Sequence, residues 1–291
     1  MADVKKIKQI FKSYDADTTT FSLYPLIYGN LNIVKYLYQH GFISESDELP
    51  LQLAASFGHL EVVKFLVEKC TYVQAAIDYC FVLAACHGHL ETVQFLHDNG
   101  AGDYHGSVMT MASENGKLNV VKYLCEMGID VTEKNNYAIR WATYNGHFAL
   151  VKYLYQQGGD ARADDDFALI AAAKFGHFEM VKFFYERGAN IQACNNAALL
   201  YASENGYIDI VMFLYGNGCD IRTNNDLVLK RAVLYGQLSI VKYLFECGVD
   251  VHVENEYLMK IAFQLGHFDV VKFLNEKGCD ENTKPATFNC C

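Results

Sequence analysis

The chain has 291 residues and carries 34 acidic against 24 basic side chains, for a formal net charge of −10. This acidic balance, without a basic block, disfavours binding to phosphate backbones, so no nucleic-acid partner is expected. The apolar runs are shorter than the roughly 18–20 residues of a membrane span, and no secretory signal opens the chain. The ten cysteines show no pairing rhythm, which is typical of free thiols in a reducing compartment. We therefore expect an intracellular protein without membrane contact, in the cytoplasm or alternatively the nucleus.

Residues 1–19 are predicted to form an N-terminal capping helix. Val4, Ile7 and Phe11 recur at helical spacing, and lysines occupy the other sides of this helix. A helix with a single apolar stripe suits the end of a repeat array, where the outer face meets water. The lysines could alternatively form a nucleic-acid or membrane patch, but a solvated capping helix already accounts for them.

Residues 20–278 consist of one segment of about thirty residues that occurs nine times. The copies align on a leading glycine, and a valine follows that glycine by five residues in every copy. An internal repeat of this length predicts a solenoid, in which neighbouring units bury a common core. Residues 279–291 follow as a short C-terminal tail. The leading glycines are Gly29, Gly58, Gly88, Gly116, Gly146, Gly176, Gly206, Gly236 and Gly266.

Each copy predicts two short helices, separated by the leading glycine. In the first helix, an alanine four residues before the glycine and a large apolar residue seven before it share one face. In the second helix, apolar residues four, five and eight positions after the glycine do the same. The glycine is expected to end the first helix in a left-handed conformation. No strand pattern of useful length occurs, so the predicted fold class is all-α.

Three other columns recur: histidine directly after the glycine in five copies, lysine six residues after it in seven, and an aromatic residue seven after it in all nine. Stacked helices lie about 8–10 Å apart, which is too far for the histidines to share a zinc ion, so a row of metal-binding histidines is not expected. The lysines are expected to pair with glutamates three residues before or four after them. For the aromatic residues, packing between second helices is favoured over base stacking. The histidines are His59, His89, His147, His177 and His267.

The segment 51–66, with Leu-x-Leu-Ala-Ala-x-x-Gly-His-Leu, resembles the ankyrin repeat, as do Gly-Ile-Asp-Val at 128–131 and Gly-Ala-Asn-Ile at 188–191. The resemblance implies an ankyrin-type solenoid of about nine stacked helix–turn–helix repeats. It also implies that the histidine after the leading glycine stabilises the turn between the two helices. Ankyrin units usually have 33 residues and begin with Thr-Pro-Leu-His, of which only Pro50-Leu51 is kept. The missing residues fall in the family's hairpin loop, so shortened loops with little or no strand pairing are expected. Thirty-residue units of this kind resemble those of large DNA viruses.

No motif in the sequence indicates catalysis, a metal or a cofactor. The chain lacks a glycine-rich phosphate loop, H-E-x-x-H and G-x-S-x-G, and residues 164–166 lack the alternating ligands of a calcium loop. The repeated positions are occupied by packing, so recognition is expected in the residues that vary between copies. The predicted function is a monomeric, non-enzymatic protein–protein interaction scaffold. The resemblance implies that partner proteins bind through the loop tips and the concave first-helix face.

The candidate contact residues lie directly before the leading glycines or on the first helices. Exposed aromatic side chains at such places are suited to anchor an interface. Two alternatives stay open: an adaptor that recruits a target to a ubiquitin ligase, or a structural solenoid in a larger particle. A viral protein of either kind would be expected in the host-cell cytoplasm. The candidate residues are Phe57, Arg140, Tyr144, Asn145, Lys174, Phe175, Glu204, Asn205, Leu234 and Tyr235.

Overall fold

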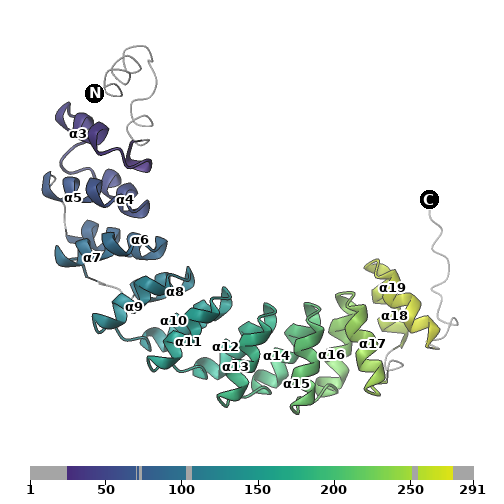
Figure 1. Ribbon diagram of the computed structural model, residues 1–291. Coiled ribbons are helices and arrows are strands. Elements are labelled where there is room, and N and C mark those ends of the chain that lie inside the picture. The colour runs from purple at the N-terminus through teal and green to yellow at the C-terminus, as the bar shows by residue number, and fades with distance from the viewer. Residues whose placement is uncertain (1–24, 70, 72–73, 103–106, 251–254, 278–291) are drawn as a thin grey trace, which may run out of the picture. The chain divides into compact units, whose positions relative to one another are not determined.

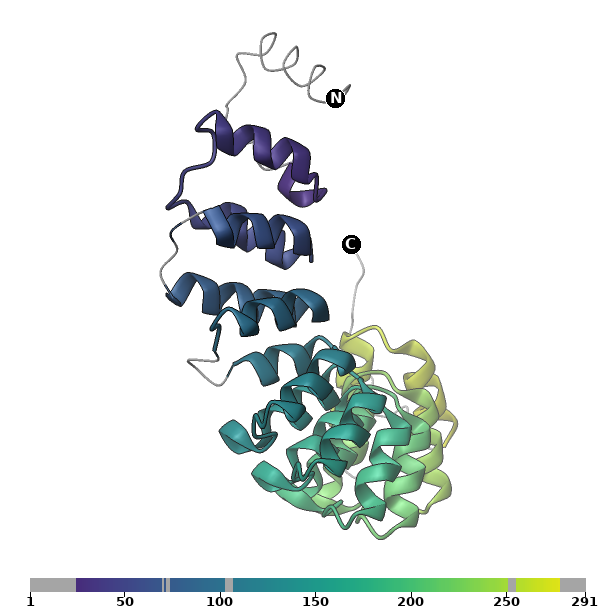
Figure 2. The ribbon, with the colours of Figure 1, turned by 60° about the vertical axis from the view of Figure 1, so that its left-hand side comes forward.

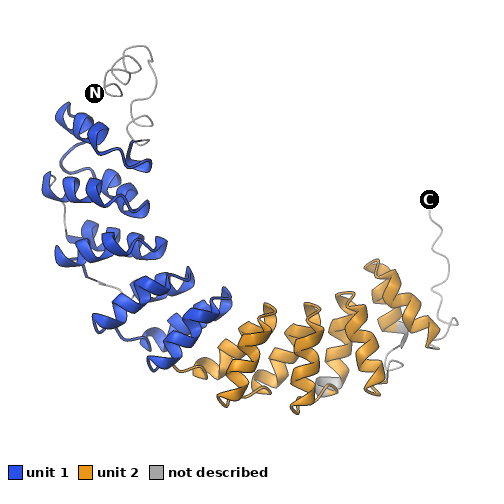
Figure 3. Ribbon diagram, viewed as in Figure 1, with its two compact units in different colours: residues 1–159 blue, residues 160–291 orange. Residues whose placement is uncertain are grey.

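The computed structural model divides into two compact units, residues 1–159 and residues 160–291 (Figure 3). The boundary falls in a loop between two helix pairs, and each unit is described here by itself. The predicted capping helix and C-terminal tail lie outside the described residues, and the predicted limits of the repeat array stay a prediction. The described residues are 25–69, 71, 74–102, 107–250 and 255–277.

Both units consist of short helices in the described residues, with no strand among them, which confirms the predicted all-α class (Figure 1). In residues 1–159 the helices are α3 (Leu31–Gln39), α4 (Glu48–Ser56), α5 (Leu60–Lys69), α6 (Gln74–His87), α7 (Leu90–Asp98), α8 (Val108–Glu114), α9 (Leu118–Glu126), α10 (Glu133–Tyr144) and α11 (Phe148–Gln156). In residues 160–291 they are α12 (Ala163–Lys174), α13 (Phe178–Glu186), α14 (Ala193–Glu204), α15 (Ile208–Gly216), α16 (Thr223–Leu234), α17 (Leu238–Glu246), α18 (Asn255–Gln264) and α19 (Phe268–Glu276).

Each repeat contributes a first helix before its leading glycine and a second helix after it, and the two pack together as a hairpin (Figure 2). First helices pack on first helices: α4, α6, α8 and α10 follow one another in the first unit, and α12, α14, α16 and α18 in the second. Second helices form the other layer, through α3, α5, α7 and α9 in one unit and α13, α15, α17 and α19 in the other. The predicted helix–turn–helix stack is therefore confirmed.

The repeated apolar columns form the core. The alanine four residues before the leading glycine has no exposed surface in any copy that has it, from Ala54 to Ala262. The valine five residues after the glycine is fully buried in the first eight copies, and only Val271 in the last copy is half-buried. A valine side chain stabilises a fold by roughly 1.5–3 kcal/mol when it leaves water, and the smaller alanine by less. The buried side chains of the core therefore recur at the same spacing as the repeats of the sequence.

The leading glycines have two structural roles. All nine have a positive φ, between 67° and 86°, so each ends its first helix in the left-handed conformation that was predicted. A second role was not predicted. A Cβ added to Gly58 would overlap the imidazole of His89, which extends back from the next repeat, and Gly116 has the same relation to His147. At Gly58 and Gly116, glycine is therefore required both for the positive φ and because the histidine ring of the next repeat lies where a Cβ would stand.

The loops that lead to the next first helix contain a left-handed turn. Residues 134–136, 164–166 and 194–196 all have φ between 50° and 60°, at the start of α10, α12 and α14. This conformation costs roughly 1–2 kcal/mol per residue for most side chains, and asparagine and aspartate tolerate it best. Seven of the nine residues are asparagine or aspartate. The shortened loops were predicted without strand pairing, and their left-handed geometry is an addition to that prediction.

Hydrogen bonds connect successive loops at the register of these turns. The Asp78 carboxylate, at the register of the third turn residue, accepts a 2.9 Å hydrogen bond from the backbone N–H of Gly102 in the next loop. In the second unit, burial raises the pKa of Asp166, and a hydrogen bond from the backbone of Asn190 opposes that rise. Both carboxyl groups are almost fully buried. In these two repeats, one end is thereby bonded to the next repeat.

Candidate interaction surface

The residue pairs before the leading glycines lie at the C-terminal ends of the first helices. Tyr144 is the last residue of α10, and Phe57 and Tyr235 cap α4 and α16. Their exposed fractions are 46% for Phe57, 37% for Tyr144 and 44% for Tyr235. Lys174, Asn145 and Asn205 are exposed as well, whereas Phe175, Glu204, Leu234 and Arg140 are half-buried.

We use the name first-helix face for the residues nine, six, five and two positions before each leading glycine, together with the residue directly before it. The ten candidate residues all belong to this face by their register. Four lie in the first unit and six in the second. The structure therefore places the candidates of each unit on one layer, the layer of first helices.

Contacts from the next repeat fix the backbone of this face. The Nε2–H of His89 donates to the backbone oxygen of Ser56 at 2.8 Å, two residues before Gly58. Burial of the ring lowers the pKa of His89, which favours the neutral imidazole. The histidines were predicted to stabilise their own turns, and the bond instead extends to the preceding repeat. His59, His147 and His267 make the same contact to the oxygens of Ile27, Glu114 and Leu234 at 2.6, 2.9 and 3.0 Å.

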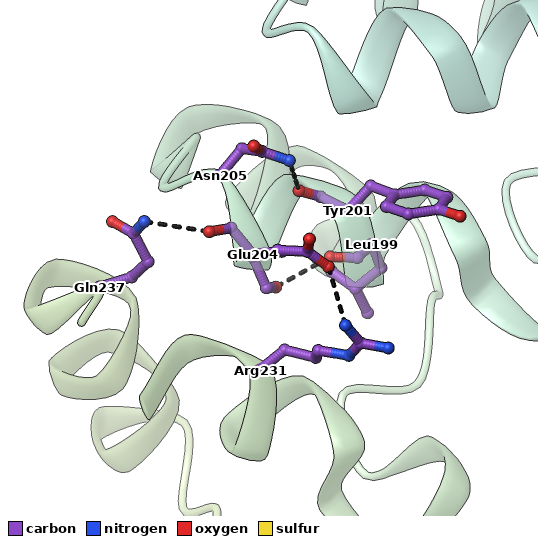
Figure 4. Close-up of polar contacts among 7 residues, drawn as sticks. Leu199, Tyr201, Glu204, Asn205, Arg231 and Gln237 are labelled. Carbon is purple, nitrogen blue, oxygen red and sulfur yellow. Dashed lines mark hydrogen bonds and ion pairs between the residues drawn. The ribbon is translucent and has the colours of Figure 1, made fainter. Parts of the chain in front are cut away.

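Glutamine can replace histidine in this contact. The Nε2 amide of Gln237 donates to the backbone oxygen of Glu204 at 3.0 Å, as the histidines do elsewhere (Figure 4). An imidazole as such is therefore not needed for this contact. Asn205, next to Glu204, donates its own side-chain amide to the oxygen of Tyr201 at 2.9 Å. Hydrogen bonds therefore fix both the backbone oxygen of Glu204 and the side-chain amide of Asn205.

In the second unit, charged side chains of the first-helix face are held by neighbours on the same face. The Glu204 carboxylate lies 3.1 Å from Nη1 of Arg231 on the next first helix (Figure 4). The Nζ of Lys174 lies 5.1 Å from the ring centre of Tyr201, also on the next first helix, and 5.5 Å from that of Phe175. Cations over aromatic rings are stabilised by about 0.5–1 kcal/mol at exposed sites.

In the first unit the same face is apolar and aromatic. Leu49, Tyr79 and Tyr137 stand nine residues before their glycines and are 45%, 52% and 38% exposed. Tyr144 packs against the half-buried Trp141 at 5.2 Å, and Arg140 lies 4.9 Å above the ring of Tyr137. The register nine before the glycine was not among the candidates. It could have been found, because on a helix this position points away from the buried residue seven before the glycine.

The layer of second helices has a different character, because its recurring aromatic residues pack against one another. Tyr185 meets Phe213 edge to face at 5.4 Å, and Tyr215 meets Tyr243 at 6.3 Å. The predicted packing between second helices is confirmed for these pairs, in which the recurring aromatic residue contacts the residue nine positions after the preceding glycine. Edge-to-face pairs of this kind contribute about 0.5–1.5 kcal/mol beyond their buried area.

The lysines of the second helices are partly paired as predicted. Lys64 and Lys182 form ion pairs with Glu61 and Glu179, three residues earlier, at 2.8 and 2.9 Å. Lys242 is placed differently, with its Nζ 5.8 Å from the ring centre of Phe273 in the next repeat. Many polar and aromatic side chains of the second helices therefore make contacts with other residues of the repeats.

We found no arrangement of catalytic type in the part of the chain that the structure describes. Within it, no group of three or more histidine, cysteine or acidic residues is placed to hold a metal ion. No described helix is long and apolar enough to cross a membrane. Burial raises the pKa of the Cys80 and Cys219 thiols to about 12, so neither is an activated nucleophile at neutral pH.

Comparison with known proteins places these repeats in a family. A family model described as ankyrin repeats (3 copies) matches residues 3–78, 77–135, 139–225 and 199–285. Two proteins of Acanthamoeba polyphaga mimivirus that are named as ankyrin repeat proteins are similar over part of the chain. L66 is 36% identical over 114 residues and R837 is 27% identical over 115 residues, which are 39% and 40% of this chain. The matches span only 14% of the length of either relative. Ankyrin repeats generally mediate protein–protein interaction, and the chain belongs to the ankyrin repeat family.

Proposed function

We propose that this protein is a non-enzymatic interaction scaffold that binds a partner protein through its first-helix face. The observation that carries the proposal is the group of exposed apolar side chains on the first-helix face of α4, α6, α8 and α10 in the first unit, namely Leu49, Phe57, Tyr79, Met111, Tyr137 and Tyr144. Scattered exposed apolar residues are ordinary, but a group of them on one face is typical of an interaction surface.

Rigidity supports this assignment. The turns that carry Phe57 and the Glu204–Asn205 pair are held by hydrogen bonds from the next repeat. A surface that is already ordered loses little conformational entropy on binding, which favours affinity. Aromatic anchors such as Phe57, Tyr144 and Tyr235 are the residues on which interface energies usually concentrate.

The candidate contacts are proposed with the following roles. Phe57, Tyr144, Phe175, Leu234 and Tyr235 would provide apolar contact area. The charged and amide side chains of Arg140, Asn145, Lys174, Glu204 and Asn205 would provide hydrogen bonds and orientation at the rim. The resemblance to viral proteins favours a partner in the host-cell cytoplasm, with the chain acting as a monomer.

Affinity purification with matched variants tests the proposal. The face variant is Phe57→Ala/Tyr144→Ala. The control is Met212→Ala, which removes one exposed apolar side chain, 47% exposed, from the second helix α15. We expect a reproducible partner that wild type and control retain and the face variant loses. Equal retention by both variants, or no partner at all, would contradict the proposal.

The identity of the captured proteins separates the more specific roles. Ubiquitin-ligase subunits among them would favour an adaptor, and particle proteins would favour a structural role. If neither class is captured and the face variant loses some other partner, the protein would be a scaffold with a different target.

A further inference from the structure

We propose that the first-helix face of the second unit binds an acidic peptide segment of the partner protein. This inference rests on the proposed function and specifies the chemistry of one part of the surface. It commits to carboxylate-rich polypeptide as the occupant, in preference to a nucleic acid or an anionic membrane.

The cations of the second unit's first-helix face occupy neighbouring helices. Lys230 and Arg231 are adjacent on α16, and Lys260 stands at the register of Lys230 on α18, which packs against α16. Lys174 ends α12 and lies over Tyr201 of α14. Packed helices are about 8–10 Å apart, so these basic side chains are spread along a row and do not converge on a single anion-binding point.

The charge of this face is opposite to that of the chain. Over the register positions that define the face, α12, α14, α16 and α18 carry four basic residues and one acidic residue, whereas the whole chain has a net charge of −10. The single carboxylate, that of Glu204, already pairs with Arg231. Complementary charge of this kind steers association and selects the partner.

Aromatic residues between the cations favour a polypeptide as the occupant. Tyr235 and Tyr257 are exposed by 44% and 54% on this face, and Tyr201 lies under Lys174. Tyrosine offers both apolar area and a hydroxyl group, which suits side chains and peptide groups of a bound segment.

Exposed aspartates at the start of the first helices disfavour the binding of long polyanions to this face. Asp164 and Asp165 are exposed at the start of α12, and the exposed residues Asp160, Asp220 and Asp250 stand in the loops that precede α12, α16 and α18. A nucleic acid has one negative charge per phosphate along its length and would meet these carboxylates. A short acidic segment can place its carboxylates on the cations and end before the acidic loops.

The test uses the full chain and a fluorescein-labelled peptide of repeated Glu-Glu-Tyr triplets, with Gln-Gln-Tyr triplets as the neutral control. The face variant is Lys230→Glu/Lys260→Glu. The control variant is Lys242→Glu/Lys272→Glu, in the same two repeats, with the same charge change, on exposed residues of the second helices. Fluorescence anisotropy would be recorded at about 50 and 200 mM salt, a range over which screening of exposed charges increases strongly.

We expect the acidic peptide to bind wild type, the face variant to weaken binding about tenfold or more, and the control to weaken it by less than about threefold. Added salt should weaken binding to wild type. Equal losses in the two variants, equal binding of the neutral peptide, or no binding of the acidic peptide would overturn the inference. Tighter binding of oligothymidylate or of phosphatidylserine vesicles would assign the face to another class of ligand and would also overturn it.

Failure of this inference differs from failure of the proposed function. If Lys230→Glu/Lys260→Glu keeps the partner that Phe57→Ala/Tyr144→Ala loses, the scaffold stands and the acidic-segment inference fails. If neither variant changes capture of the partner, the assignment of the first-helix face as the binding surface is wrong.

Discussion

The first-helix faces of the two units differ in chemistry, although the helices beneath them are built alike. The first unit exposes Leu49, Tyr79 and Tyr137, and the second presents Lys230 and Lys260 on equivalent helices. The buried columns of alanine, valine and leucine are shared by both units. The comparison indicates that the positions repeated in every copy specify the stack and leave the outward positions of the first helices free to specify recognition.

The largest expected effect tests whether the two cores are equivalent. Leu124 on α9 and Leu214 on α15 are both fully buried at the same register. Replacement of either by alanine should lower the free energy of unfolding by about 2–5 kcal/mol, because it removes apolar contacts and leaves a cavity. Urea unfolding followed by circular dichroism measures the loss. Met212→Ala, at an exposed position of α15, is the control and should change stability by less than about 1 kcal/mol. A large loss in only one unit would show that the cores are not alike.

A glycine pair separates backbone strain from steric overlap. Gly58 and Gly128 have similar φ values, 71° and 84°, but only at Gly58 would a Cβ meet another side chain, that of His89. Gly128→Ala should cost about 1–2 kcal/mol through the left-handed backbone alone. Gly58→Ala should cost about 1–3 kcal/mol more, because the ring must move. Equal losses in urea unfolding would show that the histidine contact contributes little.

The histidine contact also predicts a pH effect. Burial lowers the pKa of His89 from its usual value of 6.5, so the unfolded chain binds the proton more readily. Stability should therefore fall as the pH is lowered through that usual value, and only by a small amount because the ring stays partly exposed to solvent. His89→Gln, which can donate as Gln237 does, should keep stability near neutral pH within about 0.5 kcal/mol and reduce the pH dependence. Urea midpoints at about pH 7.5 and 5.5 measure this, and an unchanged pH dependence in the variant would contradict the assignment.

The smallest expected effect concerns the proposed surface itself. Asn205 is exposed, and its side chain makes a 2.9 Å hydrogen bond to the oxygen of Tyr201. Asn205→Ala should lower the free energy of unfolding by about 0.5 kcal/mol or less, because water can replace an exposed hydrogen bond. A loss comparable to that of Leu214→Ala would place Asn205 among the structural residues instead of the recognition residues.

The sequence predicted the helices because their signals are local and recur. A glycine, a valine and a large apolar residue at fixed spacing define each hairpin, and these side chains lie in the core as expected. The contacts between repeats were not predicted in the same detail. His89 bonds to a residue 33 positions earlier, and Asp78 bonds to one 24 positions later. Partners at such distances follow from how the repeats stack, which the spacing within one copy does not specify.

The candidate surface was predicted in part. The residues next to the leading glycines lie at helix ends on one layer, as their register indicated. The apolar residues nine before the glycines, such as Tyr79 and Tyr137, were missed although their register pointed away from the core. The left-handed turns at residues 164–166 and 194–196 could not be inferred locally, because such turns persist only where bonds to the next loop offset their strain.

Hydrogen exchange of the complex with a captured partner reports which layer of helices becomes protected on binding. We expect the protection to concentrate in the first helices and the turns that follow them, for example at the ends of α4, α10 and α16. The second helices α5, α11 and α17 should exchange as in the free protein. Protection confined to the second helices would contradict the assignment of the first-helix face as the site of recognition.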